Sequence, residues 1–193
     1  MNPFRQIALL MRITRSQGII RRYFVVNGFD GALTMLGLII GFIISGPAEL
    51  SLVIGACLGA AIALGVSGVS SAYISEVAER RRALTELEEA MVKDLHESAH
   101  GQAARWIPLL IALVNGSSPL FFSMIIISPL WLANAGVDLF APPLVGAITI
   151  ALMVIFLLGV FLGRISGISK LRSGLQALFV ALITATLIFL IAH

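Results

Sequence analysis

The sequence predicts an all-α, polytopic membrane protein with about five transmembrane helices. Of its 193 residues, 59% are hydrophobic and 12% are charged, and the mean hydropathy is +1.01. A soluble domain is nearer half apolar and a quarter charged, so this composition is typical of a protein embedded in a bilayer. The apolar residues form runs that are each long enough to cross a hydrocarbon core roughly 30 Å thick. These runs are residues 25–46, 50–73, 107–127, 142–163 and 175–192.

The distribution of positive charge predicts the orientation of these runs. All 13 Lys and Arg residues lie before the first run, between the second and third, or between the fourth and fifth. Because cytoplasmic loops carry an excess of Lys and Arg, we expect the N-terminus inside and the C-terminus outside. The first residues lack the continuous apolar segment of a cleavable signal peptide. Together with the short chain, this favours the plasma membrane of a prokaryote.

Two segments outside the apolar runs are also expected to be helical. Residues 1–24 mix apolar side chains with arginines and predict a basic interfacial helix on the cytoplasmic leaflet. Residues 75–105 are rich in Ala, Glu, Leu and Arg, which favour helix. We therefore expect the second run to continue into an acidic cytoplasmic insertion within a five-helix transmembrane domain, residues 25–193.

The third run is expected to begin near Trp106 and Pro108, an aromatic interface anchor followed by a helix-start proline. The stretch Asn115-Gly116-Ser117-Ser118-Pro119 interrupts it. We expect a break in the helix there, which frees backbone carbonyls to face protein or a water-filled path. Asn115 and the carbonyls around Gly116 are therefore candidate ligands.

Asp30 is the only acidic residue within the five apolar runs. A carboxylate inside the bilayer costs a few kcal/mol, so it normally faces a polar interior and binds an ion, a proton or a basic partner. Two other interpretations are a hydrated position at the interface and a cap on a helix that begins there. Gly28 and Gly31 flank Asp30 and would let a ligand or a neighbouring helix approach the backbone.

Small residues and methionines recur in the spans. Small residues four apart let helices pack closely, within one protomer or across a dimer. Met35 and Met124 offer soft thioether ligands for a transition metal, although a lone methionine in a membrane helix is more often a packing residue. Cys57 is expected to be a packing residue as well. The small residues of the first two spans include Gly37, Gly41, Gly55, Gly59, Gly65, Ser67, Gly68, Ser70 and Ser71.

The acidic insertion holds a second candidate metal site. On a helix, its residues at steps of three and four share one face. Carboxylates with two imidazoles can hold a divalent first-row metal. The alternative is a solvated helix joined by Glu–Lys and Glu–Arg pairs, which a lysine in the middle of the stripe favours. The residues of this stripe are Glu86, Glu89, Lys93, His96 and His100.

Enzyme motifs are missing from the sequence, which has no nucleophile elbow, no phosphate-binding P-loop and no His-Glu-x-x-His pair. We therefore expect no enzymatic activity, no permanently bound cofactor and no nucleic-acid partner.

The chain resembles the vacuolar iron transporter family in four stretches. Residues 28–34, with Gly41 downstream, are similar to that family's first-span Ser-Asp-Gly-Leu motif and the glycine that follows it. The other three stretches match the end of its second span, its Gly- and Pro-broken third span and the start of its fifth. They are Ser67 to Tyr73 with Glu76 and Glu79, Gly116 to Pro119 with Pro129, and Leu171 to Leu175.

This resemblance implies a homodimer in the lipid bilayer that exchanges Fe²⁺ or Mn²⁺ for protons. It assigns Asp30 the role of ion and proton ligand near the dimer axis. In our interpretation of the residues, Asn115, the carbonyls around Gly116 and Met35 or Met124 complete the shell. Two features depart from the family pattern. Ala60 and Gly68 stand where the second span usually offers a Met and an acidic residue, and the cytoplasmic domain is reduced to one helical hairpin.

Two other classes of function stay open at this point. One is a non-transporting membrane scaffold or sensor, in which Asp30 is structural and the charged helix binds a partner. The other is a conductive cation channel.

Overall fold

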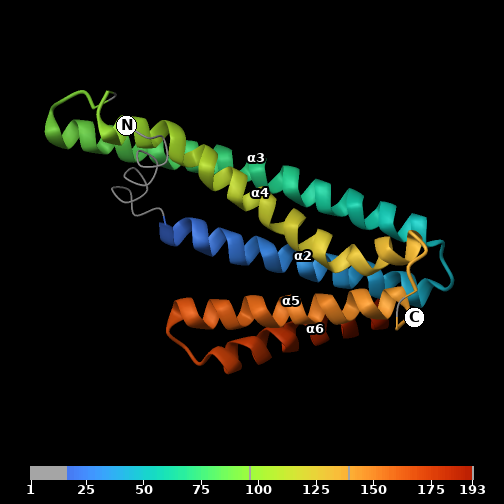
Figure 1. Cartoon of the computed structure of the whole chain (residues 1–193). Coiled ribbons are helices and arrows are strands. Elements are labelled where there is room, and N and C mark those ends of the chain that lie inside the picture. The colour runs from blue at the N-terminus through green and yellow to red at the C-terminus, as the bar shows by residue number, and fades with distance from the viewer. Residues whose placement is uncertain (1–16, 96, 139, 193) are drawn as a thin grey trace. The chain divides into compact units, whose positions relative to one another are not determined.

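The computed structural model describes residues 17–95, 97–138 and 140–192, and they form five α-helices (Figure 1). Each of the five is long and apolar enough to cross a membrane. The protein is therefore a polytopic all-α membrane protein, which confirms the fold class expected from composition. The helices are α2 (Gln17–Ser45), α3 (Leu50–Met91), α4 (Ala99–Asn134), α5 (Pro143–Ser166) and α6 (Lys170–Ala192).

Helix α3 runs without interruption from the second apolar run into the polar segment, as predicted. It forms a helical hairpin with the start of α4 (Figure 1). The chain leaves α3 through Val92, whose φ of 52° lies in the left-handed region. Beyond it, the Glu88 carboxylate accepts a hydrogen bond from the backbone N–H of Leu95 at 2.9 Å. This side chain therefore holds the turn against the end of α3.

The expected break in the third span is wrong, because α4 is continuous from Ala99 to Asn134. Pro108 and Pro129 lie inside this helix rather than at its start or in a loop. A proline removes one helical hydrogen bond, but nearby Ser side chains can satisfy the freed carbonyl. Ser128 does so next to Pro129, since its hydroxyl donates to the carbonyl of Ile125 at 2.7 Å. Sequence reasoning overestimated how strongly a proline interrupts a membrane helix.

The boundary expected between an interfacial helix and the first span is also absent from the described residues. Residues 17–24 are the first turns of α2 and continue directly into the apolar run. The rest of the predicted interfacial helix, residues 1–16, lies outside the described residues.

The chain forms two compact units. One contains Val66–Ser117 and the described residues up to Phe24, and its small apolar cluster centres on Ala103, Ile107 and Ile111. The other contains Val25–Gly65 and the chain from Ser118 onward.

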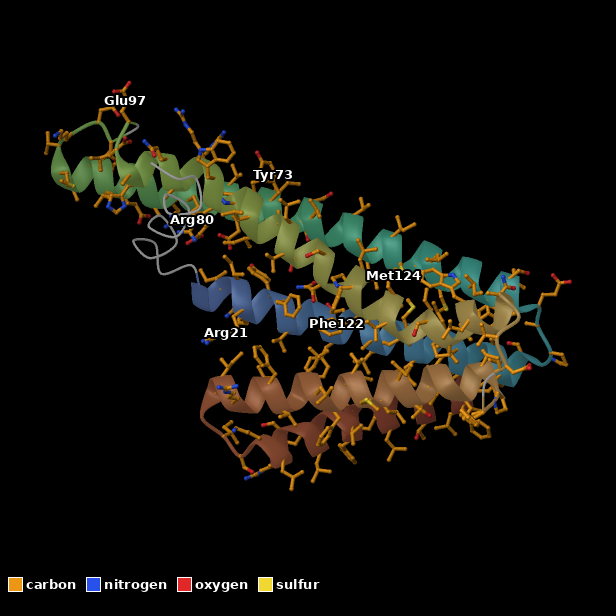
Figure 2. The ribbon with its side chains drawn as sticks, viewed as in Figure 1. Arg21, Tyr73, Arg80, Glu97, Phe122 and Met124 are labelled. Atoms are coloured by element: carbon orange, nitrogen blue, oxygen red, sulfur yellow. The ribbon has the colours of Figure 1, made fainter. Side chains whose placement is uncertain are left out.

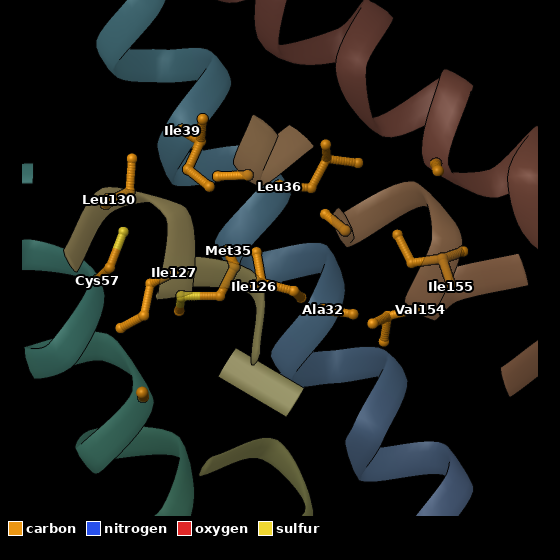
Figure 3. Packing of buried hydrophobic residues seen from close by; sticks show 14 of the residues in the cluster. Ala32, Met35, Leu36, Ile39, Cys57, Ile126, Ile127, Leu130, Val154 and Ile155 are labelled. Carbon is orange, nitrogen blue, oxygen red and sulfur yellow. The ribbon is translucent and has the colours of Figure 1, made fainter. Parts of the chain in front are cut away.

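The second unit holds the larger core, drawn in Figure 3. Met35 and Ile39 of α2 pack there with Ile126 and Ile127 of α4. Cys57 of α3 is fully buried in the same cluster, at the packing position expected of it.

Helices α5 and α6 form a hairpin that depends on glycines (Figure 1). A Cβ atom at Gly159 would lie 2.7 Å from the carbonyl oxygen of Ser173, and one at Gly163 would lie 2.6 Å from the Ser173 hydroxyl. The two backbones therefore meet almost directly. This Gly-x-x-x-Gly pair was not singled out in the sequence, although its spacing is the one that permits close helix packing.

Candidate functional site

Asp30 lies within α2, five residues beyond Val25, which places it about 8 Å along the helix from the start of the apolar run. Its side chain is exposed on the surface of the chain, whereas Ala32 and Met35 on the other side of the helix are buried. The capping interpretation is wrong, because α2 begins at Gln17, well before Asp30. A carboxylate at this position needs water, an ion or a second protein surface around it.

The glycines beside Asp30 serve helix packing. A Cβ atom at Gly28 would lie 2.8 Å from the ring of Phe122, and one at Gly31 would lie 2.8 Å from the backbone of Pro119. Phe122 is on α4 (Figure 2). Of the two roles considered for these glycines, the structure shows the approach of a neighbouring helix. This crossing fixes which face of α2 turns inward and leaves Asp30 on another face.

Asp30 belongs to a stripe on α2, which we call the polar stripe. Its members recur at alternating steps of three and four residues and are exposed or half-buried in the protomer: Asn27, Asp30, Thr34, Gly37 and Gly41. A Cβ atom built on Gly41 would meet no atom of the described chain within 4 Å, and the same holds for Gly55 and Gly59 on α3. Gly41, Gly55 and Gly59 therefore do not serve packing within the described chain, whereas a Cβ atom at Gly37 would lie 3.2 Å from Cδ1 of Ile188 on α6.

The two candidate methionines lie in or against the large core. Met35 is fully buried between Ile126 and Ile127 (Figure 3), and Met124 is half-buried against the same cluster. An apolar environment of this kind suits methionine as a packing residue. Their role as ion ligands stays a prediction, and for Met35 the structure shows a packing position.

Asn115 and Gly116 lie in the other unit, where α3 and α4 pack closely. The Asn115 side-chain amide donates a hydrogen bond to the backbone carbonyl of Gly68 at 2.7 Å. A Cβ atom at Gly68 would lie 3.1 Å from the Cα of Gly116. Gly68, one of the positions where the resemblance would have placed an ion ligand, is therefore a helix-packing residue. The structure gives Asn115 a role in that packing, and its role in an ion path remains a prediction.

The acidic hairpin does not bring the candidate metal ligands together within the described residues, where no three His, Cys, Asp or Glu side chains form a group suited to a metal. Glu86, Glu89 and His100 are exposed. The Glu86 carboxylate accepts a hydrogen bond from Arg82 at 2.9 Å, which is a pairing of the kind considered as the alternative. His96 lies outside the described residues, so the complete stripe stays a prediction.

Three consecutive arginines in the hairpin, Arg80 to Arg82, have different surroundings. Arg80 pairs with Glu76 at 3.5 Å, and both side chains are largely buried. Arg82 pairs with Glu86 and is 79% exposed. Arg81 lines a pocket instead. Steps of four residues predict the two pairs, but only the packing of α4 against α3 separates Arg81 from its neighbours.

Five helices that are long and apolar enough to cross a membrane define this chain as an integral, multi-pass membrane protein. Over 173 residues it is 33% identical to the uncharacterized protein MJ0645 of Methanocaldococcus jannaschii, covering 88% of this chain and 87% of that protein. The chain therefore belongs to the same family as this archaeal protein. No family model matches the sequence, and no solved structure matches it.

Proposed function

We propose that the protein is a homodimeric transporter that exchanges a divalent transition-metal cation, Fe²⁺ or Mn²⁺, for protons across the membrane. Asp30 is the group that binds the ion and carries the proton. The resemblance of residues 28–34 to the first-span motif of the vacuolar iron transporters supports this substrate class. A scaffold, a sensor or a channel could have the same fold. These alternatives differ from the exchanger in the role of Asp30.

The exposure of Asp30 within α2 is the observation that carries the proposal. Intramembrane carboxylates face a protein interior or a water-filled cavity, and one protomer leaves this carboxylate uncovered. A second copy that packs its own polar stripe against this one would bring two Asp30 side chains together across a two-fold axis. Two carboxylates at close range repel each other unless a cation or a proton lies between them. Metal and protons would then compete for one site, which is the basis of exchange.

Oxygen atoms would complete the coordination shell. Asn27 and Thr34 carry oxygen atoms on the same face of α2, about one turn on either side of Asp30. Carboxylate, carbonyl and water ligands suit hard ions such as Mn²⁺, whereas thiolate and thioether ligands select softer ones. The polar stripe therefore favours Mn²⁺ or Fe²⁺ bound largely through oxygen.

The tip of the hairpin supplies negative charge for attracting cations. Glu88, Glu89 and Asp94 surround a shallow hollow there together with Lys93. Clustered charge of one sign raises the local concentration of the opposite ion and speeds its association. We assign this surface to cation attraction and not to tight metal binding.

The test is uptake of Mn²⁺ and Fe²⁺ by proteoliposomes, with and without an imposed pH gradient. Wild type is compared with Asp30→Asn, which keeps the shape of the side chain and removes its charge. Asp138→Asn is the matched control, because Asp138 is exposed beyond the end of α4. We expect gradient-dependent uptake that Asp30→Asn abolishes and Asp138→Asn retains.

Three outcomes would contradict the proposal. Wild-type vesicles that move neither ion would favour the scaffold or sensor alternative. Asp30→Asn vesicles with wild-type uptake would remove Asp30 from the path. Uptake that Asp30→Asn abolishes but that is insensitive to the pH gradient would indicate the channel in place of the exchanger.

A further inference from the structure

A pocket of about 420 Å³ opens between α3 and α4 at the base of the hairpin. The α3 side chains that line it follow one helix face, and those of α4 fall at steps of three and four residues. They are Tyr73, Val77, Arg81 and Leu84 of α3 with Gly101, Ala104 and Arg105 of α4. The lining thus contains two guanidinium groups, one phenol and no carboxylate.

The electrostatics of this pocket differ from those of the surrounding hairpin. The neighbouring arginines are neutralised, Arg80 by Glu76 and Arg82 by Glu86. Within the described part of the chain, Arg81 and Arg105 make no ion pair with a carboxylate. Two exposed and uncompensated guanidinium groups in one pocket attract an anion and repel a metal cation.

The pocket lies where the chain passes from the apolar spans to the polar hairpin. Tyr73 ends the apolar part of α3, and Trp106, which is exposed, directly follows Arg105. Figure 2 shows Tyr73 near the base of the hairpin, with Glu97 near its tip. Tyr and Trp gather at the level of the lipid headgroups in membrane proteins. We therefore expect Arg105, next to Trp106, near the depth of the lipid headgroups, with Arg81 in the same pocket.

We propose that this pocket binds the headgroup of an anionic phospholipid from the leaflet on the hairpin side. The planar guanidinium groups of Arg81 and Arg105 would hold the phosphate through paired N–H···O bonds. The Tyr73 hydroxyl would donate a further hydrogen bond. The apolar lining side chains, those of Val77, Leu84 and Ala104, suit the glycerol and the first acyl carbons of the lipid. The proposal does not depend on ion transport.

The test measures lipid binding to the purified full-length protein in detergent by native mass spectrometry. Phosphatidylglycerol is compared with phosphatidylcholine, whose choline cation the arginines disfavour. We expect wild type to bind phosphatidylglycerol more tightly than phosphatidylcholine. The double variant Arg81→Gln/Arg105→Gln should lose about fivefold in affinity for each arginine, so that the preference disappears. Arg82→Gln removes the same charge from a position on α3 outside the pocket lining and should retain the preference.

A second variant distinguishes a loss of lipid binding from a folding defect in the double variant. Tyr73→Phe leaves both charges in place and should weaken phosphatidylglycerol binding by about two- to fivefold through the lost hydrogen bond. The proposal would be overturned by no lipid preference in wild type, by an unchanged preference in a folded double variant, or by an equal loss in Arg82→Gln. The last measurement is competition with excess inorganic phosphate. If it displaces the lipid as effectively as phosphatidylglycerol itself does, the ligand is soluble phosphate and the lipid assignment is wrong.

Discussion

The side-chain amide of Asn115 on α4 donates a 2.7 Å hydrogen bond to the backbone carbonyl of Gly68 on α3. This bond lies next to the close contact of Gly68 with Gly116. The amide of a membrane-buried Asn must find an acceptor, and a carbonyl left accessible by a glycine provides one. Asn115 therefore holds α3 and α4 in register.

Asn115→Ala should lower the stability of the α3–α4 pair by about 0.5–1.5 kcal/mol, the range of interhelical hydrogen bonds in membranes. The measurement is the unfolding transition in mixed micelles of mild detergent and dodecyl sulfate. Ser117→Ala is the control, because the Ser117 hydroxyl donates only to the Val114 carbonyl of its own helix. Equal stability of the two variants would show that the Asn115 bond contributes little.

Gly31→Ala should destabilise the second unit by about 1–3 kcal/mol, because the new methyl group would lie 2.8 Å from the backbone of Pro119. Gly41→Ala is the matched control on the same helix, since its Cβ would meet no described atom within 4 Å. That control should be neutral or slightly stabilising in the monomeric state, because alanine favours helix over glycine. Thermal unfolding of the two variants in detergent compares them directly. If Gly31→Ala unfolds no earlier than Gly41→Ala, the close crossing of α2 and α4 is not as described.

Val92→Gly should raise the free energy of unfolding by about 0.5–1 kcal/mol. A β-branched residue is strained at a φ of 52°, and glycine adopts this conformation without that cost. Val137→Gly, in the turn after α4, should instead be neutral or destabilising, because Val137 has no positive φ. Thermal unfolding of the two variants measures the difference. A Val92→Gly variant less stable than wild type would show that the backbone at Val92 is not strained.

Glu76→Gln should destabilise the hairpin by about 1–2 kcal/mol. It removes the carboxylate 3.5 Å from the largely buried Arg80 guanidinium and leaves the positive charge in place. Adding Arg80→Gln should recover part of the loss, since a neutral pair costs less to bury than a single charge. A double-mutant cycle on unfolding free energies measures this coupling. Strict additivity would mean that the two side chains do not interact.

Thr34→Cys should form an intermolecular disulfide in membranes when an oxidant is added, if the polar stripe faces a second copy. The natural Cys57 is fully buried and contributes no background. Phe179→Cys is the control, because Phe179 is exposed on a different helix, α6. Dimer bands on non-reducing gels for Thr34→Cys alone would support the two-fold arrangement, and equal bands for both variants would reflect random collision.

The sequence determined the fold class because the bilayer imposes a length and a composition on every span. The short turn from Ser45 to Leu50 and the continuation of α3 to Met91 followed from local signals, namely a Gly-Pro pair and a run of strong helix formers. Asp30 could also be singled out, since a carboxylate in an apolar run is costly wherever the run packs.

Only the tertiary structure decided which faces meet. Gly28 and Gly31 pack on α4, whereas Gly41 is left open, and nothing in their identity separates them. Pro119 and Pro129 remain within one helix, because satisfying a freed carbonyl depends on which polar groups lie beside it. Likewise the spacing of four residues pairs Arg80 with Glu76 and Arg82 with Glu86, but the packing of α4 against α3 is what buries the first pair and places Arg81 in a pocket. The composition of a span can be read from its residues one by one. The contacts between helices depend on how each helix is rotated about its axis, and that is set by the packing of the whole chain.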